Sequence, residues 1–217
     1  MRRLRSGNGV KQYVRKCISP LAAKRLVYFA IFAGFIFASG YAGLLFASNN
    51  FHVVVPGALY RSAQPDAAEI EDYKARYGLK TVINLRGANP GRRWYKDELA
   101  ASARAGITHI DFGMSARKLQ PREKIARLIT ILNSAEKPIL IHCESGADRT
   151  GLVSALYLAA IEKRDENAAE AQLSIRYGHI GIPMLSQAYP MDQSFEEVKG
   201  MLGYSDTASN NLLKKTS

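Results

Sequence analysis

The sequence has 217 residues, of which 47% are hydrophobic, and its formal net charge at pH 7 is +11. Eight positive charges lie in the first 25 residues, so the remaining chain has a net charge of only +3 and lacks the basic surface typical of nucleic-acid binding. The two cysteines, Cys17 and Cys143, and the roughly 170 residues after the apolar N-terminal part favour one domain without structural disulfide bonds.

The apolar N-terminal segment, residues 26–47, carries no charged side chain. As a helix it would extend about 33 Å, which is enough to cross a bilayer. By the positive-inside rule, the basic residues before it stay in the cytoplasm. We therefore expect a cytoplasmic tail at 1–25, a single-pass anchor in the cell (inner) membrane at 26–47, and an extracytoplasmic domain after it. The alternatives are a buried core helix and a signal peptide cleaved near Ala47-Ser48.

The rest of the chain alternates between strand-like and helix-like segments. Residues 48–65 are expected to form a linker and the start of the domain, with short strands at 52–55 and 58–61. The predicted elements that follow are helix 67–77 between Asp66 and Gly78, strand 80–85, helix 94–105, strand 107–112, helix 121–133, strand 138–142, and helices 150–162, 166–177 and 192–202. This order predicts an α/β fold with a mostly parallel central sheet flanked by helices, preceded by one transmembrane helix. The domain is expected to span 66–203, with a polar tail at 204–217.

The segment 142–151 reads His-Cys-Glu-Ser-Gly-Ala-Asp-Arg-Thr-Gly and joins a predicted strand to a predicted helix. The five residues between Cys143 and Arg149 can curl so that their N–H groups point inward and hold a tetrahedral oxyanion. The helix that begins at Thr150 directs the positive end of its dipole toward the same point. Both effects favour the thiolate, which is the nucleophilic form of cysteine.

This pattern predicts a site that hydrolyses phosphate monoesters. Cys143 is the expected nucleophile, and Arg149 presents a planar fork for the phosphoryl oxygens. The Thr150 hydroxyl can donate to the sulfur when water attacks the intermediate, and His142 can orient the loop. The expected phosphate-binding residues are Glu144, Ser145, Gly146, Ala147, Asp148 and Arg149. A nucleotide-binding P-loop is excluded because no lysine precedes Thr150, and Arg149-Thr150-Gly151 suits phosphate better than the substrate of a sulfurtransferase.

The segment from His142-Cys143 to Arg149-Thr150-Gly151 resembles the signature of the cysteine-dependent protein tyrosine phosphatase superfamily. Leu-Tyr-Arg-Ser-Ala-Gln-Pro at 59–65, Thr-Val-Ile-Asn-Leu-Arg at 81–86 and Asp-Phe-Gly at 111–113 occur in the order seen in its atypical dual-specificity phosphatases, both the bacterial members and the plant and fungal branch. The resemblance covers residues 56–180. It implies a parallel sheet between helices, no metal or organic cofactor, Cys143 as nucleophile, Arg149 as phosphate binder and the backbone of 144–148 as the cradle.

The general acid is open between two aspartates. Asp111 ends a predicted strand, and Asp148 lies within the loop itself, where some lipid-type and bacterial relatives also carry aspartate. We favour Asp148, although a purely structural role is the alternative. Relatives that act on inositol phosphates tend to carry basic residues inside the loop. Glu144, Ala147 and Asp148 stand there in this chain, which argues against a very highly charged substrate.

Several side chains beside the predicted site can shape the choice of substrate. Trp94 and Tyr95 can stack on a phosphotyrosine ring, and four arginines lie in or beside loops near the expected phosphate: Arg61, Arg86, Arg92 and Arg93. The alternative is a solvated basic loop with a core tryptophan. His179 can line the site, but a satisfied structural histidine is the favoured interpretation.

The sequence therefore predicts a membrane-anchored phosphatase of tyrosine or dual specificity that forms a phosphocysteine intermediate. Its expected partners are a phosphorylated protein or other phosphomonoester substrate and the membrane, with no nucleic acid. One alternative is a phosphatase of the same mechanism for a phospholipid, an inositol phosphate or a small phosphomonoester. Another is a phosphate-binding module without turnover, against which the combination of Cys143, Arg149 and Thr150 speaks.

Overall fold

A computed structural model describes residues 20–204, and contacts divide the chain into two units with the boundary between Tyr41 and Ala42. Helix α1 spans Pro20–Ala47. Its 24-residue stretch Lys24–Ala47, with a mean hydropathy of 1.9, is long and apolar enough to cross a membrane. None of the most apolar part of this stretch is buried, whereas the core helix of a soluble protein is mostly buried. A signal sequence near the N-terminus would have the same length and apolar composition. Residues 1–19, which include Cys17, and residues 205–217 lie outside the described residues, so most of the predicted tails at 1–25 and 204–217 is not described.

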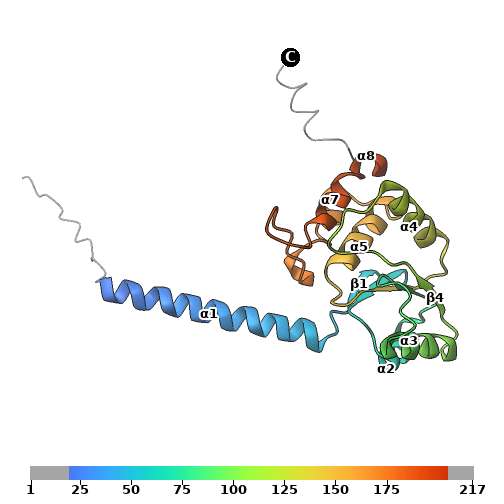
Figure 1. The fold of residues 1–217 in the computed structure, drawn as a ribbon, viewed down its shortest axis with the longest axis horizontal. Coiled ribbons are helices and arrows are strands. Elements are labelled where there is room, and N and C mark those ends of the chain that lie inside the picture. The colour runs from blue at the N-terminus through green and yellow to red at the C-terminus, as the bar shows by residue number, and fades with distance from the viewer. Residues whose placement is uncertain (1–19, 205–217) are drawn as a thin grey trace, which may run out of the picture. The chain divides into compact units, whose positions relative to one another are not determined.

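The second unit is built on a five-stranded sheet, whose strands β1 and β4 are labelled in Figure 1. The sheet has the strand order β1-β2-β5-β3-β4. Its strands are β1 His52–Val55, β2 Leu59–Ser62, β3 Thr81–Asn84, β4 Thr108–Asp111 and β5 Ile139–His142. Only β1 is antiparallel to its neighbour, so the predicted mostly parallel sheet is confirmed. The two short strands predicted within residues 48–65, at 52–55 and 58–61, are confirmed as β1 and β2.

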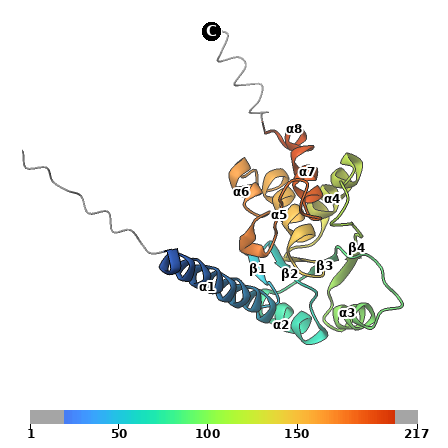
Figure 2. The ribbon, with the colours of Figure 1, turned by 60° about the vertical axis from the view of Figure 1, so that its left-hand side comes forward.

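Helices cover both faces of this sheet (Figures 1 and 2). One face packs against α2, Ala67–Tyr77, and α3, Arg93–Arg104. The other packs against α4, Arg122–Ser134, α5, Asp148–Ala160, and α7, Pro190–Glu196. Neighbouring strand residues face opposite layers: Ile139 and Ile141 join the core under α5, whereas Leu140 joins the core over α2.

Helix α2 begins and ends where the sequence predicts. Asp66 accepts a hydrogen bond from the Glu69 amide, and the Glu69 side chain accepts one from the Asp66 amide, which completes a capping box. Gly78 ends the helix with φ of +69°, a conformation that glycine adopts without steric cost.

Two predicted C-terminal helices are wrong as continuous elements. The segment 166–177 forms α6, Glu166–Glu170, and a separate 3₁₀ turn, Ile175–Tyr177. Between them the backbone carbonyl of Gln172 accepts a hydrogen bond from the buried Arg61 side chain, which replaces its helical partner. The segment 192–202 divides into α7 and α8, Lys199–Leu202. Helix α5 begins two residues earlier than predicted, at Asp148.

Candidate active site

The carboxyl ends of the three central strands meet at one edge of the sheet. Strand register sets His142 beside Ser62 on one side and Asn84 on the other, and Asp111 lies beside Asn84. Ligands bind at this edge in parallel α/β sheets. The chain leaves β5 through residues 143–147 and enters α5 at Asp148, so the predicted signature lies where a strand ends and a helix begins.

The loop from Glu144 to Ala147, here called the cradle loop, is held by its carbonyl oxygens. The Glu144 carbonyl accepts from the Gln64 amide at 3.3 Å, and the Ser145 carbonyl accepts from Nδ2 of Asn50 at 2.9 Å. The carbonyls of Gly146 and Ala147 both accept from Arg61, at 3.0 and 2.9 Å. All four carbonyls therefore point toward the surrounding protein.

The amide groups of the same segment have no such partners. Within the described chain, no hydrogen bond is found for the backbone N–H groups of residues 144–150. Three of these groups belong to the first turn of α5, where helix geometry leaves them free. A row of unpaired N–H groups at a helix N-terminus is an anion-binding arrangement.

Gly146 allows the cradle loop to lie against the end of β2. Its φ is +69°, and a Cβ atom built there would stand 2.6 Å from the amide nitrogen of Ala63. Both the backbone conformation and the close approach require a residue without a side chain at this position.

Cys143 and Arg149 stand at the two ends of the cradle loop. Cys143 is only 1% exposed and belongs to the core that packs under α5. The Arg149 guanidinium makes a single long hydrogen bond, 3.5 Å from Nη1 to the Leu85 carbonyl, and its buried Nε has no partner among the described residues. Most of the hydrogen-bonding capacity of Arg149 is therefore available to a ligand.

Arg61 has a different position from the one expected. Its side chain is fully buried beneath the cradle loop, and it also donates to the Thr150 hydroxyl at 3.1 Å and stacks on the Tyr177 ring. Arg61 does lie beside the cradle loop, but the expectation that it shapes the choice of substrate is wrong, because its side chain is buried and all its acceptors lie inside the protein. Burial lowers the pKa of Arg61 to about 10, so it remains a cation at neutral pH. Among the described residues, Thr150 makes no hydrogen bond to Cys143; its hydroxyl lies 3.5 Å from the Ala147 carbonyl.

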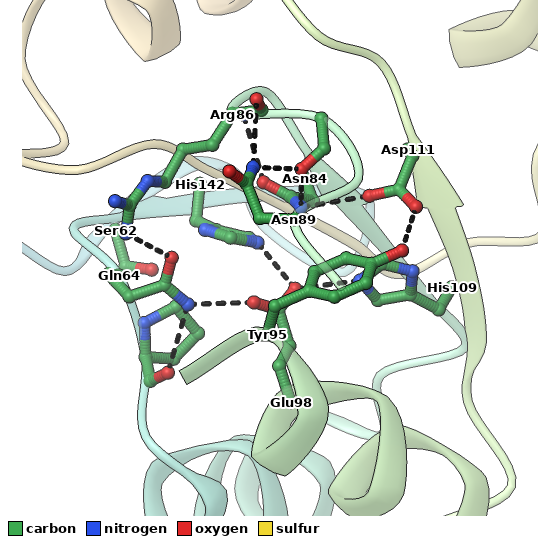
Figure 3. Close-up of polar contacts among 12 residues, drawn as sticks. Ser62, Gln64, Asn84, Arg86, Asn89, Tyr95, Glu98, His109, Asp111 and His142 are labelled. Atoms are coloured by element: carbon green, nitrogen blue, oxygen red, sulfur yellow. Dashed lines mark hydrogen bonds and ion pairs between the residues drawn. The ribbon is translucent and has the colours of Figure 1, made fainter. Parts of the chain in front are cut away.

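The two candidate general acids have different surroundings. One oxygen of Asp148 accepts from Nδ1 of His179 at 2.7 Å, and the other has no hydrogen-bond partner among the described residues. Both oxygens of Asp111 are occupied: Oδ1 accepts from Asn84 at 2.8 Å, and Oδ2 accepts from the Tyr95 hydroxyl (Figure 3).

His179 is buried between two carboxylates, as the structural interpretation favoured. Its Nε2 donates to Asp192 of α7 at 3.0 Å, opposite the contact with Asp148. Burial lowers the pKa of His179, but the hydrogen bonds to Asp148 and Asp192 outweigh it and raise the pKa to about 9. His179 is thus an imidazolium at neutral pH.

A buried carboxylate that sequence reasoning missed lies below the cradle. Glu98 of α3 accepts from His142 at 2.7 Å, from His109 at 2.8 Å and from Gln64 at 2.7 Å (Figure 3). Burial raises the pKa of Glu98, but the hydrogen bonds from His109 and His142 outweigh it and lower the pKa to about 2. A sequence signal existed, because Glu98 lies on the same helix face as the buried residues Tyr95, Ala101 and Ser102.

An open cleft of about 470 Å³ is lined in part by Gln64, whose backbone amide bonds to the Glu144 carbonyl of the cradle loop. Arg86 joins the two, since it donates to Gln64, which lines the cleft, and lies 3.9 Å from a carboxylate oxygen of Glu144. The Arg86 guanidinium also covers the Trp94 ring. Tyr95 is buried and its hydroxyl bonds to Asp111, so the prediction that its ring stacks on a substrate is wrong. The side chains of Arg92 and Arg93 are exposed to solvent.

Comparison with known proteins points to one family. Residues 42–177 match the model of the tyrosine phosphatase family. The chain is 27% identical over 166 residues to the dual specificity protein phosphatase TpbA of Pseudomonas aeruginosa strain UCBPP-PA14, covering 70% of this chain and 71% of TpbA. It is 30% identical over 156 residues to the inositol diphosphatase SIW14 of Saccharomyces cerevisiae, covering 69% of this chain and 50% of that protein.

Solved structures of the same two relatives share the fold. The crystal structure of TpbA superposes with a TM-score of 0.54 at 24% identity, covering 72% of this chain and 90% of TpbA. The catalytic core of Siw14 gives a TM-score of 0.53 at 24% identity, covering 77% of this chain and 91% of the core. The comparisons therefore contain both a protein phosphatase and a phosphatase that acts on an inositol compound.

Proposed function

This chain belongs to the tyrosine phosphatase family, and from that premise we propose that it hydrolyses phosphate monoesters through a phosphocysteine intermediate on Cys143. The observation that carries the proposal is the orientation of the cradle loop. Its four carbonyls bond to the surrounding protein, while the N–H groups of residues 144–150 remain unpaired. Such a row of donors suits the three outer oxygens of a phosphoryl group.

In the first step the Cys143 thiolate attacks phosphorus, an S–P bond forms and the bond from phosphorus to the leaving oxygen breaks. The leaving oxygen takes a proton from a general acid. In the second step a water molecule attacks phosphorus, the S–P bond breaks, and inorganic phosphate and the thiolate are released. Arg149, with its unpaired Nε, binds the equatorial oxygens in both steps. Thr150 stabilises the sulfur as it leaves, after its hydroxyl turns from Ala147.

Asp148 is the proposed general acid. It adjoins Arg149, one of its carboxylate oxygens has no hydrogen-bond partner in the described chain, and His179 holds the other. Asp111 is the alternative, but both of its oxygens are already engaged by Asn84 and Tyr95. A proton donor needs an oxygen that can approach the leaving group, and this requirement favours Asp148.

The proposed substrates are phosphoproteins, with tyrosine or dual specificity. The exposed Glu144 and the partly exposed Asp148 make the rim of the cradle less favourable to a molecule that carries many phosphates. The similarity to TpbA, a dual specificity protein phosphatase, supports a protein substrate. The similarity to SIW14, an inositol diphosphatase, supports the alternative, in which the substrate is an inositol phosphate, a phospholipid or a small phosphomonoester.

We further propose that residues 26–47, which lie within the apolar stretch Lys24–Ala47, anchor the chain in the cell membrane, with residues 1–25 in the cytoplasm and the domain that follows the anchor on the other side. The length and apolarity of this helix support an anchor, and the eight positive charges before residue 26 support the orientation. A reporter enzyme that is active only in the cytoplasm, fused after Ser217, should be inactive. An active reporter would contradict the orientation.

The function is tested with the full chain in detergent and three phosphorylated substrates at equal concentration. These are a phosphotyrosine peptide, a phosphoserine peptide and a dispersed phospholipid monoester. Release of phosphate is expected to be fastest from the phosphotyrosine peptide and to disappear with Cys143→Ser. Residual turnover by Cys143→Ser would exclude the phosphocysteine route, and an inactive unmodified chain that still binds phosphate would indicate a binding module.

A further inference from the structure

A run of six apolar residues is exposed directly after the candidate site. Residues 180–185, Ile-Gly-Ile-Pro-Met-Leu, here called the apolar loop, contain no polar side chain. Ile180 and Ile182 are each about half exposed, Leu185 is 78% exposed and Met184 is completely exposed. Soluble proteins avoid contiguous exposed apolar surface unless it binds something.

The apolar loop is fixed to the candidate site. His179, immediately before it, bonds to Asp148 of the first turn of α5 and to Asp192 of α7. Gly181 packs on the Asp192 carboxylate, since a Cβ atom there would lie 2.3 Å from its oxygen. The backbone of the loop is therefore held in place while its large side chains point outward. A surface bound by this loop would lie beside the cradle.

The same segment adjoins the end of the apolar helix. A Cβ atom at Gly178 would lie 3.2 Å from a methyl group of Leu45 and 3.8 Å from Cβ of Ala147 in the cradle loop. Asn50 donates to the carbonyls of both Tyr177 and Ser145. Leu45 belongs to the last turn of α1, so Gly178, two residues before the apolar loop, packs where the chain leaves the proposed anchor.

We propose that the apolar loop docks on the surface of the bilayer that residues 26–47 cross, with Ile182, Met184 and Leu185 inserted at the boundary between headgroups and acyl chains. The inference rests on the proposed function and on the proposed anchor. It extends both, because it presents the cradle to phosphate monoesters that stand at the membrane surface. The strength of binding at the membrane interface rises with the apolar area that is buried between headgroups and acyl chains.

The position of the loop is tested by fluorescence in proteoliposomes of the full chain. Trp94 is the only tryptophan, so Trp94→Phe provides a background without tryptophan, into which Leu185→Trp is introduced. The matched control is Glu136→Trp, which is also exposed but precedes β5 at the opposite edge of the sheet. Brominated phosphatidylcholine should remove most of the fluorescence at position 185 and leave that at 136 unchanged. Equal quenching at both positions would overturn the proposal.

A second measurement separates docking from catalysis. The double variant Met184→Ser with Leu185→Ser should lower kcat/KM roughly tenfold for a phosphomonoester lipid in the same vesicles, because it removes two apolar insertions. Its kcat/KM for soluble p-nitrophenyl phosphate should not change. An equal loss of kcat/KM on both substrates would refute docking on lipid. Quenching at position 185 that rises with the protein-to-lipid ratio would also refute it, because it would indicate contact with a second copy of the chain. Turnover of p-nitrophenyl phosphate by the unmodified chain tests the proposed function independently.

Discussion

The carboxylate of Glu98 lies 2.7 Å from Nε2 of His142, the residue that precedes Cys143. Both side chains are completely buried, and the contact joins α3 to the central strand of the sheet. The same carboxylate binds His109 and Gln64, so one anion fixes three elements around the floor of the cradle. Ionised groups at such depth persist only when they are paired.

Glu98→Ala should destabilise the protein by about 3–5 kcal/mol, because it leaves two buried histidines and Gln64 without their acceptor. Urea denaturation measures the loss. Glu71→Ala is the control, since Glu71 forms an exposed ion pair with Arg104 and its removal should cost less than about 1 kcal/mol. Equal effects of the two substitutions would contradict the importance of the buried network.

Arg61→Lys should destabilise the fold by about 2–5 kcal/mol and reduce turnover, although it preserves the charge. Lysine has no planar fork that can reach the carbonyls of Gly146, Ala147 and Gln172 together. Stability is measured in urea and phosphate affinity by calorimetry. Unchanged phosphate affinity in Arg61→Lys would show that these bonds do not shape the cradle loop.

Gly146→Ala should destabilise the protein by about 1–3 kcal/mol and weaken phosphate binding, because the new methyl group would overlap the backbone of Ala63 at a positive φ. Gly91→Ala is the matched control, since nothing lies within 4 Å of a Cβ atom at that position. Thermal unfolding of both variants measures the difference. A Tm for Gly146→Ala equal to that for Gly91→Ala would exclude the close packing.

Asp148→Asn should lower kcat by about 10²–10⁴-fold for a phosphotyrosine peptide and much less for p-nitrophenyl phosphate, whose leaving group needs no proton. Asp111→Asn should change the ratio between these two substrates little. A larger loss of kcat on the peptide than on p-nitrophenyl phosphate in Asp111→Asn, but not in Asp148→Asn, would identify Asp111 as the general acid. Unchanged kcat in both variants would show that neither aspartate is the general acid. Steady-state kinetics at several pH values makes the distinction.

His179 should make stability depend on pH on the alkaline side of neutrality. Its folded pKa, about 9, lies above its unfolded value, so the stabilisation is complete below about pH 6.5 and declines as the pH rises through 9. We expect a loss of about 3 kcal/mol over this interval in urea denaturation. His179→Gln should be less stable at pH 6.5 and should lack this decline; if it shows the same decline, another group is responsible.

Much of the fold and the core of the candidate site followed from local patterns. Asp66 and Gly78 bound α2 in the structure as in the sequence, because capping acts within one turn of a helix. The predicted continuous helix over 166–177 failed because Arg61, more than a hundred positions earlier, takes the Gln172 carbonyl. Arg61 and Tyr95 were expected near a substrate because they lie in or beside segments that follow strands, but the fold turns both side chains inward.

The sequence by itself determined the order of strands and helices, the apolar helix and the interval between Cys143 and Arg149. Each of these depends on residues a few positions apart, whose relation the covalent chain restricts. Tertiary structure alone decided which side chains hold that interval in shape. Glu98 meets His142 across 44 positions, Arg61 meets Gly146 across 85 and Asn50 meets Ser145 across 95. No local pattern encodes such pairs, because they form only when packing of the whole core brings the carboxyl ends of separate strands together.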